Sequence, residues 1–283
     1  MSYLMITNFI WAFSFPLIGY YLVGHVDNYF AILSRFALAF LLFLPFINWR
    51  VNNKLKLQLT FIGAIQIGVM YIFYYQSFFY LKVSEVALFT VFTPFYVSLV
   101  YDICTKKFRA FYLFSIGLAM IGAYIIKYQD ISVDVIKGFL CVQLANLCFG
   151  TGQSLYKFII ENNKTINQKH VFGYFYLGAI VIGVISFFSF GNTNLLPSSL
   201  KQWGILVYLG VVASGIGYFL WNKGASIVDS GILAIMNNVL IPLSIIVNFI
   251  FWGVDINNIS GFIAGSFLIL ISLFVHKKMI SKY

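Results

Sequence analysis

Hydrophobic residues along the chain come in blocks of about 20, separated by short polar stretches. A helix of about 20 apolar residues crosses the ~30 Å hydrocarbon core of a bilayer, and a backbone in that core must satisfy its own hydrogen bonds. The pattern therefore predicts an all-α integral membrane protein with ten transmembrane helices. The predicted spans are 4–23, 29–49, 57–80, 85–103, 110–127, 137–158, 171–190, 203–224, 231–252 and 258–276.

Composition agrees with a membrane protein and excludes a soluble one. Of the 283 residues, 61% are apolar and 9% are charged, whereas soluble domains carry about 25% charged residues. The net charge of +10 comes from basic residues spread singly between apolar blocks, so we interpret them as topology signals and expect no nucleic-acid partner. The expected partners are the lipid bilayer and a small-molecule substrate, and the oligomeric state is open, with a monomer possible.

The basic residues are unequally divided between the two sides of the predicted membrane. Loops on the side of the termini hold 13 Lys and Arg residues, and the opposite loops hold 4, namely Lys82, Lys127, Lys137 and Lys201. Basic residues concentrate on the cytoplasmic side. We therefore predict a multi-pass protein of the cytoplasmic membrane with both termini in the cytoplasm.

The two halves of the chain align with each other. Gly63 and Gly210 are 147 residues apart, and Pro94 and Pro242 are 148 apart. The further matched sets are Asn8-x-x-Trp11 with Asn146-x-x-Phe149, Gly68 and Tyr71 with Gly215 and Tyr218, and Phe114, Gly117 and Ile121 with Phe262, Gly265 and Ile269. This order predicts two five-helix repeats, 1–130 and 131–283, the second inverted because five is odd. Inverted repeats are common in secondary transporters, where they enclose the substrate site near the membrane midplane.

Short motifs along nearly the whole chain resemble one known family. They are Ile10-Trp11-Ala12-Phe13-Ser14-Phe15, Arg35 early in the second span, the run from Val83 through Pro94 to Leu99, Gly215-Ile216-Gly217-Tyr218, and the run from Asp229 through Pro242. On these motifs the chain resembles the drug/metabolite transporter superfamily, in its bacterial form with two EamA-like domains. The resemblance implies a basket of helices around a central cavity, with solute export or exchange as the activity.

The matched prolines mark a candidate site or hinge. A proline inside a helix leaves the carbonyl four residues earlier without its hydrogen-bond partner. Pro94 and Pro242 would free the carbonyls of Thr90 and Asn238, which occupy equivalent positions in the two halves. Freed carbonyls beside polar side chains suit a solute site. The alternative is that both prolines only kink their helices for packing.

One polar stripe runs along the span 137–158. Asn146, Gly150, Gln153 and Lys157 are spaced 4, 3 and 4 residues apart and share one helix face, and Asn8 begins the matching stripe in the first span. Amides in a membrane normally face the bundle interior or a wet cavity. We expect Asn146 and Gln153 to line the cavity, with interhelical hydrogen bonding as the alternative. Lys157 is expected to extend to the membrane interface.

Arg35 lies about two turns inside the second span, where a guanidinium needs a partner. It either grips a substrate carboxylate through paired hydrogen bonds or anchors the fold by binding Asp27, Glu85 or helix-end carbonyls. The sequence favours anchoring slightly, and Arg35 stays among the candidates.

Aromatic residues recur at expected cavity positions, although single rings also serve as core or lipid-facing groups. They are Trp11, Tyr71, Tyr74, Tyr75, Tyr218 and Trp221, with Gln66, Gln76, Asn222 and Asn237 as polar neighbours. The predicted substrate-binding residues are therefore Asn8, Trp11, Arg35, Tyr71, Tyr75, Thr90, Asn146, Gln153, Tyr218, Trp221 and Asn238, with Pro94 and Pro242 as hinges.

Missing motifs narrow the function. All eight acidic residues lie in predicted loops or at span ends, and no phosphate-binding loop is present. We predict a secondary transporter of small metabolites that uses no ATP, cofactor or metal and exports or exchanges amino acids or related compounds. The alternative substrate is a nucleoside-containing metabolite such as S-adenosylmethionine. An integral membrane enzyme is the rival of another class, and the chain lacks the polar cluster it would need.

Overall fold

The computed structural model describes residues 1–106, 132–228, 230–253 and 259–280, together with residues 118, 121 and 125. Every regular element among these residues is a helix, as predicted. The elements are α1 Ser2–Tyr21, α2 Asn28–Phe43, η1 Leu44–Phe46, α3 Asn53–Gly63, η2 Ala64–Val69, α4 Met70–Ser77, α5 Val83–Phe89, η3 Thr90–Phe92, α6 Thr93–Thr105, α8 Val133–Asn162, α9 Gln168–Phe190, η4 Thr193–Leu195, α10 Leu200–Val207, η5 Tyr208–Gly217, α11 Tyr218–Ala225, α12 Ser230–Trp252 and α13 Ile259–Ile280.

Seven segments of the described residues are long and apolar enough to cross a membrane. They are Ser2–Tyr21, Asn28–Phe46, Asn53–Ser77, Val83–Thr105, Val133–Asn162, Gln168–Phe190 and Leu200–Ala225. Each coincides with one predicted span, and α12 and α13 coincide with the last two. The fifth predicted span, 110–127, lies almost entirely outside the described residues, so the number ten stays a prediction.

Polar residues between the apolar blocks set where several helices begin. Asp27 accepts a hydrogen bond from the Phe30 amide at the start of α2, and Asn52 does the same for Lys54 at the start of α3. Ser132, Asn167 and Ser199 cap α8, α9 and α10 in this way. Each cap satisfies one backbone N–H that the helix itself leaves open.

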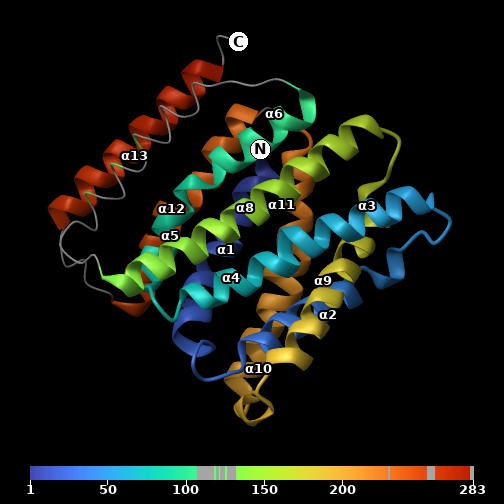
Figure 1. Ribbon diagram of the computed structural model, residues 1–283, viewed down its shortest axis with the longest axis horizontal. Coiled ribbons are helices and arrows are strands. Elements are labelled where there is room, and N and C mark those ends of the chain that lie inside the picture. The colour runs from blue at the N-terminus through green and yellow to red at the C-terminus, as the bar shows by residue number, and fades with distance from the viewer. Residues whose placement is uncertain are drawn as a thin grey trace.

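Helices from the two halves of the chain interleave in the bundle. α6 packs on α8, α1 on α12, and α2 and α3 on α9, and Figure 1 shows α9 lying alongside α2. At one end of α2 the Asp27 amide donates to the Leu195 carbonyl over 2.7 Å, and beyond the other end the Asn48 amide donates to the His170 carbonyl over 2.9 Å. The loop after α1 and the loop after α8, which the sequence alignment pairs, therefore lie at opposite ends of the bundle.

Close packing of α3 on α9 depends on small residues. A methyl group added at Gly63 would overlap the carbonyl oxygen of Phe175, and one added at Gly178 would overlap that of Thr60. Small residues allow membrane helices to approach this closely. Gly63 and Gly178 therefore allow the two helices to pack in direct contact.

Two segments contain π-helices at equivalent places. η2 joins α3 to α4, and η5 joins α10 to α11. Gly68 in η2 and Gly215 in η5 are the residues that the sequence alignment pairs. A π-turn shifts the hydrogen-bond register and is frequent at functional sites.

Pro94 breaks its helix in a way that differs from the prediction. Because proline has no N–H, the Thr90 carbonyl loses its usual partner, but the Thr93 amide donates to Thr90 instead and closes the 3₁₀ turn η3. The carbonyl that becomes available is Phe89, which accepts hydrogen bonds from Asn146 Nδ2 over 2.9 Å and from Gln143 Nε2 over 3.3 Å. The expectation of a free Thr90 carbonyl is therefore wrong by one residue. Pro242, by contrast, lies inside the continuous helix α12.

Candidate functional site

A pocket with about 670 Å³ of empty space lies at the centre of the bundle. Part of this space is open to solvent. The lining residues come from both halves of the chain: Trp11, Ser14, Phe15, Ile18, Met70, Tyr71, Tyr74, Thr90, Thr93, Ala145, Asn146, Phe149, Tyr218, Trp221, Asn237 and Leu240. Six of the eleven predicted binding residues are among them: Trp11, Tyr71, Thr90, Asn146, Tyr218 and Trp221.

One wall of the pocket is aromatic. The Trp11 ring lies 4.8 Å from that of Tyr218 and 5.0 Å from that of Trp221, measured between centroids. Trp11 Nε1 donates to the carbonyl of Ala213 in η5 over 2.9 Å, and Trp221 Nε1 donates to Gln153 Oε1 over 3.3 Å. Because both indole N–H groups are held by the protein, the ring faces are left to pack against an apolar solute.

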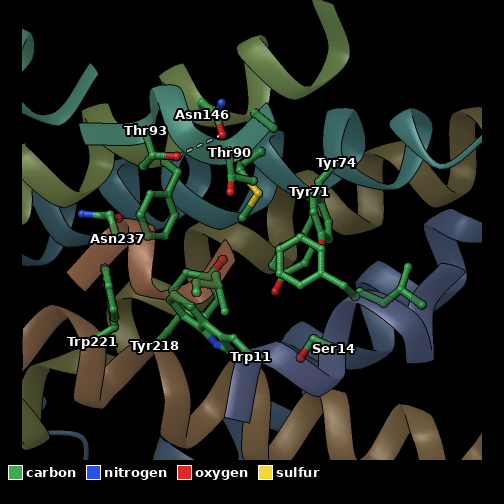
Figure 2. Close-up of a pocket in the computed structure, with 16 residues that line it drawn as sticks. Trp11, Ser14, Tyr71, Tyr74, Thr90, Thr93, Asn146, Tyr218, Trp221 and Asn237 are labelled. Carbon is green, nitrogen blue, oxygen red and sulfur yellow. Dashed lines mark hydrogen bonds between the residues drawn. The ribbon is translucent and has the colours of Figure 1, made fainter. Parts of the chain in front are cut away.

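The opposite side of the pocket is polar. Figure 2 shows Thr90, Thr93 and Asn146 together, across the pocket from Trp11, Tyr218 and Trp221. Thr93 Oγ1 donates to Asn146 Oδ1 over 3.1 Å, and Asn237 adds a further amide from α12. The Phe89 carbonyl freed by the helix break orients Asn146. A few fixed hydroxyl and amide groups among apolar walls are the usual means of orienting a bound molecule.

Tyrosines and a buried cation form a third side. Tyr71 and Tyr74 line the pocket, and Arg35 lies behind Tyr71 with none of its surface exposed. Arg35 Nη2 donates to the Tyr71 hydroxyl over 2.6 Å, Nη1 to the Tyr75 hydroxyl over 3.1 Å and Nε to Ser214 Oγ over 3.1 Å. Arg35 therefore contacts the pocket through Tyr71.

The other predicted residues are buried around the pocket and do not line it. Asn8 Nδ2 donates to the Met236 carbonyl over 2.8 Å, which joins α1 to α12. Tyr75 binds Arg35, Gln153 binds Trp221, and Asn238 is buried in α12 with no hydrogen-bond partner for its side chain among the described residues. Cavity lining is thus correct for Asn146, whereas Gln153 makes the interhelical hydrogen bond that was its alternative.

Lys157 differs from its prediction. Its side chain does not extend to an interface but is buried, with Nζ donating to the carbonyls of Ala225 and Val228 over 3.0 and 2.8 Å and lying 3.0 Å from Glu161 Oε1. The reason is that α8 continues to Asn162, so Lys157 lies inside the bundle beside the end of α11. The last carbonyls of a helix need such donors.

Sequence reasoning missed several lining residues. Ser14 and Thr93 are the polar ones, and Asn237 was expected only as a neighbour. A signal existed for Ser14, because Trp11, Ser14 and Ile18 follow helical spacing on one face of α1. Thr93 faces the pocket because of the turn at Thr90–Phe92, which no periodicity reveals.

Metal binding has no support in the part of the chain that the structure describes. No three His, Cys, Asp or Glu residues lie close enough there to hold a metal ion. The polar groups of the pocket are hydroxyls, amides and phenols, which suit an organic solute better than a metal.

Proteins of known name resemble the chain along nearly its whole length. It is 47% identical over 283 residues to the biotin transporter of Escherichia coli (strain K12), covering 99% of this chain and 94% of the relative. It is 46% identical to the biotin transporter of Salmonella typhimurium (strain LT2), with the same coverage. The probable biotin transporter of Pseudomonas aeruginosa (strain PAO1) is 43% identical over 254 residues, 89% of each chain.

A family profile and a solved structure extend this comparison. A crystal structure that is 14% identical in sequence matches with a TM-score of 0.71 over 97% of this chain and 98% of its own, which shows a common fold. The profile of the EamA-like transporter family matches residues 1–128 and 136–276. These matches confirm the resemblance drawn from the motifs and identify a multi-pass membrane protein, and the chain belongs to the EamA-like transporter family.

Proposed function

We propose that this protein is a secondary transporter that carries biotin across the cytoplasmic membrane. The observation that carries the proposal is the identity of 43–47%, over 89–99% of the chain, to proteins named biotin transporter or probable biotin transporter. The predicted amino-acid substrate receives no support from these relatives, and biotin replaces it here.

The chemistry of the pocket supports biotin as cargo. Biotin has a fused ring system with a cyclic urea and a thioether, and an alkyl chain that ends in a carboxylate. The ring system and chain suit the wall of Trp11, Tyr218 and Trp221, because aromatic faces bind apolar and sulfur-containing groups well. The urea offers two N–H donors and one carbonyl acceptor, which match the amides and hydroxyls of Asn146 and Thr93.

We assign the binding of the bicyclic ring to the space between these two walls. Trp11 and Trp221 would pack against one side of the ring, and Asn146, Thr93 and Asn237 would orient the urea. Leaving a buried polar group unpaired costs about 1–3 kcal/mol. A solute without a hydrogen-bonding head group would therefore bind more weakly by roughly 10-fold or more.

Counterflow in proteoliposomes tests the proposal. Purified protein is reconstituted into vesicles loaded with unlabelled biotin, and entry of external radiolabelled biotin is followed without ATP. We expect labelled biotin to accumulate transiently in these vesicles and not in vesicles without protein. Asn146→Ala should raise the half-saturating biotin concentration about 10-fold, since one hydrogen bond to a buried group is lost, whereas Gln202→Ala in the exposed cap of α10 should leave it unchanged.

The same vesicles decide between biotin and other cargo. Folded protein that moved no biotin, but exchanged an amino acid or S-adenosylmethionine, would overturn biotin as the substrate. Folded protein that exchanged none of the three would contradict transport of this class of metabolite. Folding is checked by a single symmetric peak in size-exclusion chromatography before reconstitution.

A further inference from the structure

Arg35 is a buried cation that the described part of the protein supplies with no carboxylate. Three of its five N–H donors reach side-chain oxygens, those of Ser214, Tyr75 and Tyr71. The guanidinium carbon also lies 4.3 Å from the centroid of the Tyr71 ring and 5.9 Å from that of Tyr75. All of these groups are neutral.

The acids that would anchor Arg35 are engaged elsewhere. Asp27 accepts from the amides of Phe30 and Asn192 at the end of α2, and Glu85 accepts from the Lys82 amide at the start of α5. Neither is a partner of Arg35. A charge buried in a membrane protein is costly and normally either paired or functional, and hydroxyls and aromatic faces compensate it only in part.

Tyr71 connects this charge to the pocket. Its ring lines the pocket, while its hydroxyl oxygen accepts the short bond from Arg35 Nη2. A phenol oxygen that accepts a hydrogen bond can still donate its own O–H, and the Tyr218 hydroxyl is the neighbouring group that also bonds to Tyr71. A cation at 2.6 Å polarises the hydroxyl, and the low dielectric of the interior strengthens any bond that the hydroxyl then makes to an anion.

We propose that Arg35, acting through Tyr71, makes the pocket selective for a solute that carries a carboxylate. Biotin would lie with its ring between Trp11 and Asn146 and its carboxylate toward Tyr71. The carboxylate supplies the countercharge that Arg35 lacks, so the acid binds better than a neutral analogue of the same shape. The inference rests on the proposed function only in using biotin as the acid to be tested.

The competing role for Arg35 is purely structural, because it also joins α2, α4 and η5. A structural arginine would affect every solute equally, whereas an anion-recognising one affects only acids. The informative quantity is therefore a ratio. Two competitors of labelled biotin uptake are compared: unlabelled biotin, and biotinamide, in which an uncharged amide replaces the carboxylate. The ratio is the half-inhibiting concentration of biotinamide divided by that of biotin.

We expect this ratio to be about 10–100 in the unaltered protein, the range given by one or two hydrogen bonds to a charged group. Arg35→Gln and Tyr71→Phe should each lower it to about 3 or less, and Arg35→Lys should give an intermediate ratio, because the charge is kept but the planar set of donors is lost. Tyr75→Phe is the matched control. This variant removes a hydroxyl that accepts a hydrogen bond from Arg35, as Tyr71→Phe does, but Tyr75 does not line the pocket. The ratio should therefore persist even if total uptake falls.

A ratio near 1 in the unaltered protein, or an unchanged ratio in Tyr71→Phe, overturns the inference. If Arg35→Gln does not fold, Tyr71→Phe decides alone, with the shift in thermal unfolding caused by biotin and by biotinamide as the measurement. Failure here is distinct from failure of the proposed function: in the first case the protein moves biotin without discriminating against biotinamide, and in the second it moves no biotin at all.

Discussion

Trp221 and Gln153 form one unit of the pocket wall. The indole of Trp221 lies 5.0 Å from that of Trp11, and its N–H donates to Gln153 Oε1 over 3.3 Å. Gln153 has no exposed surface, and its Nε2 has no hydrogen-bond partner among the described residues. Gln153 thus acts on the pocket only by holding Trp221 in its rotamer, which makes it a positioning residue.

Removing this hydrogen bond should weaken substrate binding without removing it. A neutral hydrogen bond contributes about 1 kcal/mol, so Gln153→Leu should raise the half-saturating biotin concentration about 5-fold. Trp221→Phe removes the same N–H and should have a similar or larger effect. Because the two residues form one bond, the double variant should be less impaired than the sum of the single effects predicts.

The measurement is saturation of biotin counterflow in all four proteins, with Ser198→Ala in an exposed loop as the control. Fully additive effects would show that Gln153 acts elsewhere.

For single residues, the sequence predicts which helix face carries the polar side chains better than it predicts their hydrogen-bond partners. Asn146 and Gln153 lie on one stripe of α8, yet only Asn146 reaches the pocket. The difference comes from the neighbours: Asn146 faces the broken helix at Phe89, and Gln153 faces an indole. Helical periodicity places a residue on a face, but its partner depends on how the facing helix is interrupted.

The broken segment α5–η3–α6 is the element that shapes the polar side of the pocket. Pro94 redirects the Thr93 amide to Thr90 and leaves the Phe89 carbonyl to orient Asn146. Pro242, by contrast, lies inside α12, which continues from Ser230 to Trp252. The two prolines are equivalent in sequence but differ in their effect on the pocket.

Pro94→Ala should therefore impair transport more than Pro242→Ala. Alanine at 94 restores an N–H and favours a continuous helix, in which the Thr93 amide returns to Phe89 and competes with Asn146. We expect the rate of biotin counterflow per folded molecule to fall at least about 5-fold, as for the loss of one buried hydrogen bond of about 1 kcal/mol. Pro242→Ala should change it less than about 2-fold.

Counterflow per unit of monodisperse protein gives both values. If both variants lost counterflow rate equally, and protein yield fell by the same factor, both prolines would serve only helix packing.

Elements with a strong hydrophobic signal were predictable, and their interruptions were not. The spans along α1, α9 and α12 agree with prediction because length and apolarity alone define a helix in a membrane. The π-helices η2 and η5 carry no compositional mark. Their carbonyls take part in tertiary packing: Ala213 accepts from Trp11, and Ser214 accepts from Tyr176 as well as from the Tyr218 amide of its own helix.

At the scale of the molecule, the interleaving of the halves builds the pocket. The aromatic wall joins Trp11 of the first half to Tyr218 and Trp221 of the second, and the polar side joins Thr93 to Asn146. Neither half holds a complete site. The alignment of the two halves predicts a substrate site at their interface, and the described lining residues of the pocket come from both halves.

The unequal basic residues and the fold together predict how the molecule lies in the membrane. Ser198 is exposed near the Asp27–Leu195 contact at one end of the bundle, and Thr165 is exposed near the Asn48–His170 contact at the other. The loops predicted to face the cytoplasm hold 13 of the basic residues, against 4 on the opposite side.

In a variant whose Cys104, Cys141 and Cys148 are replaced by alanine, we introduce Ser198→Cys or Thr165→Cys. A membrane-impermeant maleimide should then label position 198 in intact cells and position 165 only after the membrane is permeabilised. The reverse pattern would place both termini outside the cell and contradict the orientation predicted from the basic residues.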